Sequence, residues 1–139
     1  MATFNKFNLF VSDCAQKVHN LNSDTLKVLL TNTAPVATNH LKSELTEISA
    51  VNGYTAGGAA AAFVSGNNTS GLYKLILSPV VFTASGGSIG PFQYAVLYNS
   101  TAGSSPLIGW YDYGVPITLT NGNNFTVSLD QANGTLTLQ

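Results

Sequence analysis

Short segments in which apolar and polar residues alternate fill the second half of the chain, and this pattern constrains the fold most. Residues 92–98 carry Phe, Tyr, Val and Tyr at every second position, and residues 125–129 alternate in the same way. Turns rich in Gly, Asn and Pro separate these segments. Alternation places the apolar side chains on one face of a strand. The sequence therefore predicts a mostly β chain, an antiparallel β-sandwich, with a jelly-roll as one form of it.

An amphipathic helix is predicted for the N-terminal segment, residues 1–20. Apolar residues recur there at helical spacing, at Phe7, Phe10, Val11, Cys14 and Val18, and Phe4 extends the stripe by a turn. Two interpretations of the stripe stay open: a helix packed on the domain's own sheet, or a terminal arm laid on a neighbouring subunit. With the β-sandwich assigned to residues 24–139, the chain of 139 residues is predicted to be a single domain.

Glycine and alanine dominate the middle of the chain. The run 55–63 is alanine-rich, but glycines on both sides leave little room for a helix. We predict an extended segment whose small side chains let another backbone come close. Residues 43–48 fit one or two helical turns capped by Ser43 as well as an ordered loop. Residues 67–71 are predicted to be a plain loop.

Charged residues are scarce, at 8% of the chain against about 25% in an average protein. The surface must then be built from Asn, Thr, Ser and Gly, and a net charge of −1 gives little repulsion between copies. The five basic residues are scattered lysines with no arginine, which argues against nucleic acid as a partner. No apolar run is long enough to span a membrane, and no signal peptide is seen. Synthesis in a reducing cytoplasm fits the single cysteine.

The residues that carry most enzyme chemistry are few and dispersed. Cys14, His19 and His40 do not have the spacing of a zinc site, and both histidines are expected at the surface in turn-like contexts. Glu44 and Glu47 would share a helical face, yet two solvated carboxylates are the simpler interpretation. We therefore predict that the protein is not an enzyme and holds no cofactor or metal.

An aromatic run at residues 110–113 is the remaining candidate for a binding surface. In a strand, Trp110 and Asp112 share one face, and Tyr111 and Tyr113 share the other. One pair is expected in the core and the other in an exposed contact patch, since aromatic residues are enriched at interfaces. The predicted interaction surface consists of Phe4, Phe7, Trp110, Tyr111 and Tyr113. A receptor- or glycan-binding module using Trp110 and the nearby tyrosines is an alternative of a different class.

Several segments together resemble a group of small structural proteins of tailed bacteriophages. They are LKVLLTNTAP (26–35), ELTEI (44–48) with NGYTAGG (52–58), SGGSIGPF (85–92), YAVLYN (94–99) and LIGW (107–110). The resemblance implies a head decoration, or cement, protein that stabilises the capsid by protein–protein contacts. It brings no catalytic motif and no functional residue.

The same resemblance implies a partner and a location. The partner would be the major capsid protein or another virion protein, and the chain itself would form a dimer or trimer on the surface of the virion. The protein would be made in the cytoplasm of the bacterial host. A tail, baseplate or head–tail connector subunit is the alternative within the same class.

Overall fold

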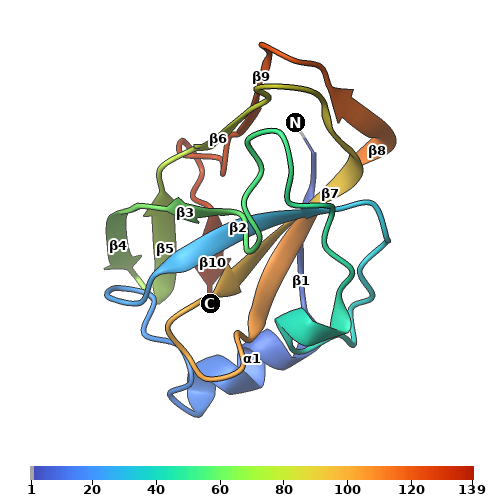
Figure 1. Cartoon of the computed structure of the whole chain (residues 1–139). Helices are drawn as coiled ribbons and strands as arrows, with labels where there is room; N and C mark the ends of the chain where they lie inside the picture. The colour runs from blue at the N-terminus through green and yellow to red at the C-terminus, as the bar shows by residue number, and fades with distance from the viewer. Residues whose placement is uncertain (1) are drawn as a thin grey trace.

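The structure is a computed structural model and describes residues 2–139 (Figure 1). Strands hold 45% of the residues and helices 8%, which confirms the predicted mostly β, antiparallel class. The strands are β1 (Phe4–Lys6), β2 (Leu26–Thr31), β3 (Ala59–Ala61), β4 (Phe63–Thr69), β5 (Leu72–Leu77), β6 (Val80–Thr83), β7 (Ile89–Asn99), β8 (Leu107–Leu119), β9 (Asn124–Val127) and β10 (Leu136–Leu138). The helical elements are α1 (Asn8–Ala15) and a single 3₁₀ turn, η1 (Lys42–Glu44).

A five-stranded antiparallel sheet in the order β1-β8-β7-β2-β3 forms the centre of the molecule. The long strand β7 lies in the middle and pairs with β2 on one side and β8 on the other. Both faces of this sheet are covered, because neighbouring side chains of β2 enter different clusters. Leu30 lies in the main core, while Leu29 packs with Val96 and Leu107 in a smaller cluster on the opposite face.

Two smaller antiparallel sheets complete the fold, one in the order β10-β5-β4 and one made of β6 and β9. The chain passes from the large sheet to the three-stranded sheet through a single residue, Ala62, which separates β3 from β4. Leu75 of β5, Phe82 of β6 and Val127 of β9 join the main core with residues of the large sheet. The three sheets therefore share one hydrophobic core.

The N-terminal helix is shorter than the predicted 1–20, of which residue 1 lies outside the described part. Phe4 belongs to strand β1 and pairs with Tyr111 of β8, and the helix covers only Asn8–Ala15. Lys17 adopts a positive φ of 65°, which ends the helix. Phe10 is fully buried, but Val11, predicted on the same stripe, is 59% exposed. Of the two open interpretations, the first is correct, because α1 contacts β8 of its own chain.

The alanine-rich segment forms strand β3 and runs beside β2, as its small side chains predicted. The turn η1 occupies the start of the ambiguous segment 43–48. The loop predicted at residues 67–71 is correct only for Ser70 and Gly71, because Asn67, Asn68 and Thr69 continue strand β4 and pair with β5. Strand β8 also runs past Gly114 and Pro116 to Leu119.

Candidate functional site

The aromatic run on β8 divides between the two faces of the sheet, as the alternation predicted. Trp110 lies on the face of the smaller cluster, where its ring is 4.6 Å from the ring of Phe7. Tyr111 and Tyr113 lie on the face of the main core. The ring of Tyr111 is 5.1 Å from that of Phe4, which the pairing of β1 with β8 brings alongside.

These positions correct part of the predicted interaction surface. Phe7 and Tyr111 are buried in their own chain, so neither ring offers an exposed surface to a protein partner. The Phe7 N–H donates a hydrogen bond to the carbonyl oxygen of Ile108, which holds Phe7 against the sheet just before α1 begins. Its ring is therefore buried. Phe4, Trp110 and Tyr113 keep partial exposure, and their role in contacts stays a prediction.

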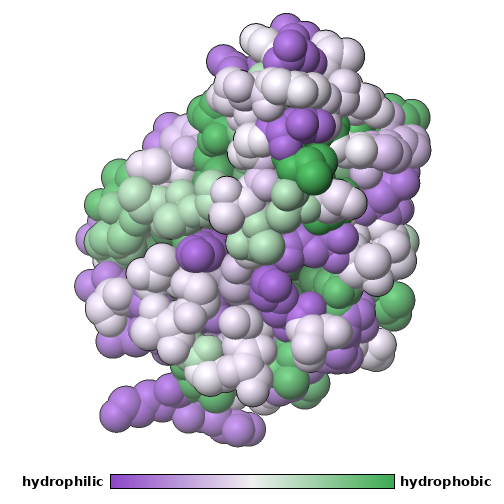
Figure 2. Space-filling model, in the orientation of Figure 1, coloured by the Kyte–Doolittle hydropathy of each residue, from purple (hydrophilic) through white to green (hydrophobic). Residues whose placement is uncertain are grey.

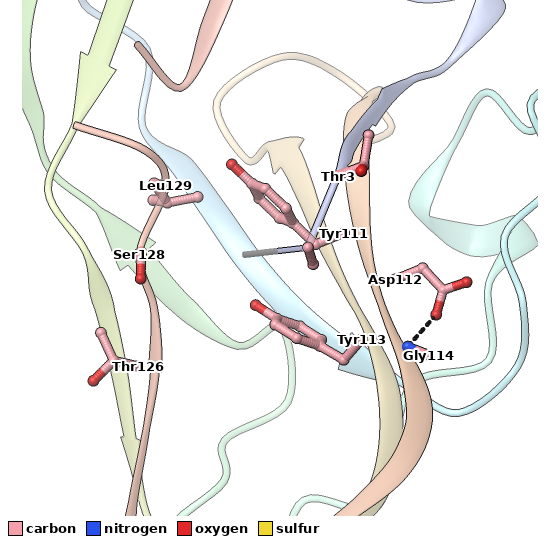
Figure 3. A pocket seen from close by; sticks show the side chains of 9 residues that line it. Thr3, Tyr111, Asp112, Tyr113, Gly114, Thr126, Ser128 and Leu129 are labelled. Atoms are coloured by element: carbon pink, nitrogen blue, oxygen red, sulfur yellow. Dashed lines mark hydrogen bonds between the residues drawn. The ribbon is translucent and has the colours of Figure 1, made fainter. Parts of the chain in front are cut away.

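Beside the two tyrosines lies a cavity of about 610 Å³ (Figure 3). Its walls come from the N-terminal segment, from β8, and from the chain in and after β9. Figure 3 shows both tyrosine side chains crossing from β8 toward the opposite wall, where Ser128 and Leu129 lie. The side chain of Asp112 points the other way, and its Oδ1 accepts hydrogen bonds from the Gly114 N–H at 2.7 Å and Gln93 Nε2 at 3.0 Å.

The hydroxyl of Tyr111 is buried and has no hydrogen-bond partner within residues 2–139. Burial raises the pKa of Tyr111 well above its usual range, with smaller contributions from Tyr113 and Asp130. Burial also raises the pKa of Tyr113 to about 12. Both phenols are therefore neutral at physiological pH and can donate as well as accept a hydrogen bond.

A polar cluster of Asp13, His19, His40 and Asn99 joins α1 to the end of β7. The expectation that both histidines lie at the surface is therefore wrong for His19. His19 is buried, and His40 is half-buried. Asp13 Oδ2 lies 2.7 Å from His40 Nε2 and 3.9 Å from His19 Nε2. On the other side of His19, its Nδ1 lies 3.0 Å from Asn99 Nδ2.

The hydrogen bonds of Asn99 fix the tautomer of His19. Asn99 Oδ1 accepts from the N–H groups of Thr101 and Ala102, so Nδ2 is the donor end. Nδ2 donates to Asp24 Oδ2 at 2.7 Å and to His19 Nδ1. His19 Nδ1 must then be the unprotonated acceptor, and the proton of the neutral ring sits on Nε2. A second proton on Nδ1 would place two donors face to face.

We expect mild acid to destabilise the fold through His19. Burial lowers the pKa of His19 below its usual value, although Asp13 and Asp24 oppose the shift and His40 adds to it. As the pH falls below about 6.5, the unfolded chain therefore takes up a proton before the folded chain does. The free energy of unfolding should fall by at most about 1.4 kcal/mol per pH unit from this one group.

Urea denaturation at several pH values between about 7 and 5 measures this loss. The loss should begin near the ordinary histidine pKa of about 6.5. His19→Gln removes the titrating group and should give a flatter dependence over the same range. If the wild-type protein and His19→Gln depend equally on pH, the titration of His19 does not govern stability.

Glu47 also departs from expectation, because it is not a solvated carboxylate. Its Oε1 accepts hydrogen bonds at 2.6 Å from the Tyr54 hydroxyl and from the Gly57 N–H, and its Oε2 lies 3.4 Å from Lys42 Nζ. Glu44 is exposed and bonds to the N–H groups of His40 and Leu41. Both glutamates thus hold loops in place, and they do not face each other across a pocket.

The polar cluster lacks the parts of a nucleophilic site. Asp13 and His40 resemble the orienting pair of a triad, but within residues 2–139 no hydroxyl or thiol hydrogen bonds to either histidine. Burial raises the pKa of the Cys14 thiol, with Asp13 adding to the rise, and a thiol in that state is a poor nucleophile. The described residues contain no group of three His, Cys, Asp or Glu placed to hold a metal ion.

Sequence reasoning missed this cluster, although one signal was present. Asp13 follows the buried Phe10 by three residues on a helix, so the two share a face and Asp13 was bound to need polar partners. Which partners it has depends on pairing between distant strands, and no local pattern carries that information.

Across the described residues, every helix is too short or too polar to cross a membrane. No protein-family profile, no curated protein and no solved structure matches this chain.

Proposed function

We propose that this chain is a non-enzymatic structural subunit of a phage virion that decorates the head and stabilises it by protein–protein contacts. The resemblance of residues 26–110 to small phage structural proteins supports the class. The observation that carries the proposal is the edge strand β4, because it is open to pairing with another chain.

Strand β4 pairs with β5 on one side only, and no strand of the described chain covers its other edge. Its sequence, FVSGNNT, contains neither a charged residue nor a proline. Soluble proteins usually protect such edges with lysine, proline or a covering loop, since unpaired N–H and C=O groups recruit further strands. Apart from a bulge between Phe63 and Ser65, which also blunts an edge, the strand is unprotected from Ser65 to Thr69. Such an edge favours a subunit that is covered in an assembly.

Apolar side chains surround this edge. Phe63 is 41% exposed and Val64 50%, and Val81 of β6, a strand that contacts β3, is 52% exposed. Ala60 of β3 and Ala62, which follows β3, are exposed as well. Figure 2 shows an apolar area over the side of the molecule where β3 and β4 lie. A weakly charged, apolar edge can be buried against another subunit without desolvating unpaired charges.

We further propose that the three sheets act as one β-sandwich. Strands of all three contribute to a common core, which is the arrangement that alternating strands favour. A jelly-roll is the specific form expected for a capsid-associated domain. The partner is the major capsid protein or another virion protein, a second copy of the chain covers part of the same edge in a homo-oligomer, and neither nucleic acid nor membrane is involved.

A tail, baseplate or connector subunit could use the same edge strand. The two candidates differ in copy number, because a decoration protein approaches the copy number of the major capsid protein and a connector or baseplate protein is present in a few copies. Quantitative mass spectrometry of purified virions separates them, and absence from the virion would refute both.

A variant of the edge tests the mechanism of attachment. We expect Val64→Lys to lower the amount of protein bound to particles by about tenfold or more, because it places a charge in the apolar contact. Val115→Lys is the matched control, since Val115 is 62% exposed on β8, outside the β4 edge. Both purified variants should melt like the wild-type protein. Equal occupancy of particles by the two variants would mean that β4 is not the attachment edge.

A further inference from the structure

We propose that the cavity beside Tyr111 and Tyr113 binds a neutral saccharide. This site lies on β8, apart from the β4 edge, so the inference goes beyond the proposed structural function and does not depend on it. It also moves any glycan-binding role from Trp110 to the opposite face of the same strand.

The buried hydroxyl of Tyr111 is the first reason. Tyr111 is 4% exposed, its hydroxyl has no partner within residues 2–139, and it lines both the 610 Å³ cavity and an adjoining cavity of about 260 Å³. In Figure 3 the hydroxyl points into the cavity toward Leu129. Nearly all buried polar groups in folded proteins are hydrogen-bonded, so an unpaired phenol aimed into a cavity indicates an absent partner.

Tyr113 supplies a second fixed hydroxyl on the same wall. Its ring packs edge-on against Phe125 with 5.0 Å between the ring centroids, and Phe125 in turn packs against Phe92. The ring is therefore held in position before any ligand arrives. The partly exposed ring of Tyr113 offers apolar surface beside the two phenol hydroxyls, a combination that suits a molecule with both C–H faces and hydroxyl groups.

The charges of the lining argue against an anionic ligand. No lysine or histidine lines the cavity within the described residues, so a phosphate or carboxylate would find no counter-charge. The carboxylate of Asp112 is already engaged by Gly114 and Gln93. The remaining polar groups are hydroxyls of Thr3, Thr126 and Ser128. Hydroxyls both donate and accept, as the hydroxyls of a sugar do.

An extended peptide fits this cavity less well than a saccharide. The pairing of β1 with β8 ends at Phe4 and Tyr111, which leaves the following residues of β8 without a strand on that side. Gly114 has a φ of 83° there, and Pro116 has no N–H to donate. A peptide would therefore meet a broken edge and could not form a regular ladder of hydrogen bonds.

Saturation-transfer NMR on the full chain tests the site with a panel of probes: maltotriose, cellotriose, mannotriose and the trimer of N-acetylglucosamine. Sialyllactose serves as the anionic comparison. We expect at least one neutral trisaccharide to bind, with an affinity about tenfold lower in Tyr111→Phe, which removes only the hydroxyl. Trp110→Phe, on the other face of the strand, is the control and should bind like the wild-type protein.

Thermal denaturation of Tyr111→Phe without ligand gives an independent readout. Because the hydroxyl is unpaired in the free protein, its removal should leave the melting temperature unchanged or raise it slightly. A clear loss of stability would mean that the hydroxyl is satisfied inside the fold, and would overturn the site. Binding that survives in Tyr111→Phe, binding lost in Trp110→Phe, or no binding by any neutral trisaccharide would also overturn it.

Discussion

Replacing Gly58 with alanine should lower the free energy of unfolding by about 4 kcal/mol or more, the largest effect expected of any substitution described here. Gly58 adopts a φ of 76°, a conformation that strains a side chain. It also lies directly against β2. A Cβ at this position would be 2.6 Å from the carbonyl carbon of Val28 and 2.8 Å from the Cα of Leu29, and closer still to the Val28 carbonyl oxygen. These are backbone atoms of a buried strand, so neither side can give way without breaking the pairing of β2 with β3.

Gly71→Ala is the matched control for this substitution. Gly71 has a similar φ of 86°, but no atom lies within 4 Å of the position of its Cβ. Gly71→Ala should lower the free energy of unfolding by only about 1 kcal/mol, because alanine disfavours this positive φ. The difference between the two variants in urea denaturation measures the close approach of the backbones. Equal losses would show that β3 does not run against β2 as described.

Asn99→Ala should cost about 3 kcal/mol, which is the second large effect. Asn99 is fully buried at the end of β7, and its side chain makes four hydrogen bonds: to Asp24, to His19 and from the backbone N–H groups of Thr101 and Ala102. Alanine leaves the buried imidazole of His19 and the half-buried carboxylate of Asp24 without their shared donor. The loop after β7 also loses its anchor.

Asn67→Ala provides the comparison, because Asn67 is an exposed asparagine on β4. Its substitution should change the free energy of unfolding by less than about 0.5 kcal/mol. Equilibrium denaturation of both variants at neutral pH gives the two values. A loss in Asn99→Ala as small as that in Asn67→Ala would mean that the polar cluster contributes little to stability.

The central strands of this fold could be predicted from the sequence, because short segments with alternating apolar residues favour strands. The alternation in 92–98 does not mark a single buried face, since Phe92 lies in the main core and Val96 in the smaller cluster. Residues 92–98 were predicted as a strand, and the aromatic run 110–113 was interpreted as part of one. They lie in β7 and β8. The small side chains of 59–61 correctly indicated a close backbone. In each case the local pattern and the tertiary environment require the same residue types.

The errors arose where tertiary pairing decides the structure. Phe4 continues a helical stripe, yet it forms a strand because Tyr111, far along the chain, offers it an edge and a ring to pack against. Strand β4 was missed because an edge strand has no buried face, and its residues Asn67 and Asn68 resemble a loop. The tyrosine cavity and the Asp13 cluster likewise combine segments that no local pattern connects.

The pairing of β2 with β7 has a consequence for the synthesis of this protein. Leu26 of β2 pairs with Asn99 of β7, and β1 pairs with β8. The central sheet therefore cannot assemble until the ribosome has made most of the chain. Until then, the apolar residues of β2 leave the exit tunnel without a partner strand. Pairing between distant segments makes folding slow, and apolar, aggregation-prone segments stay exposed until it is complete. A protein made in many copies with this topology places a sustained demand on the chaperones of the cell that produces it.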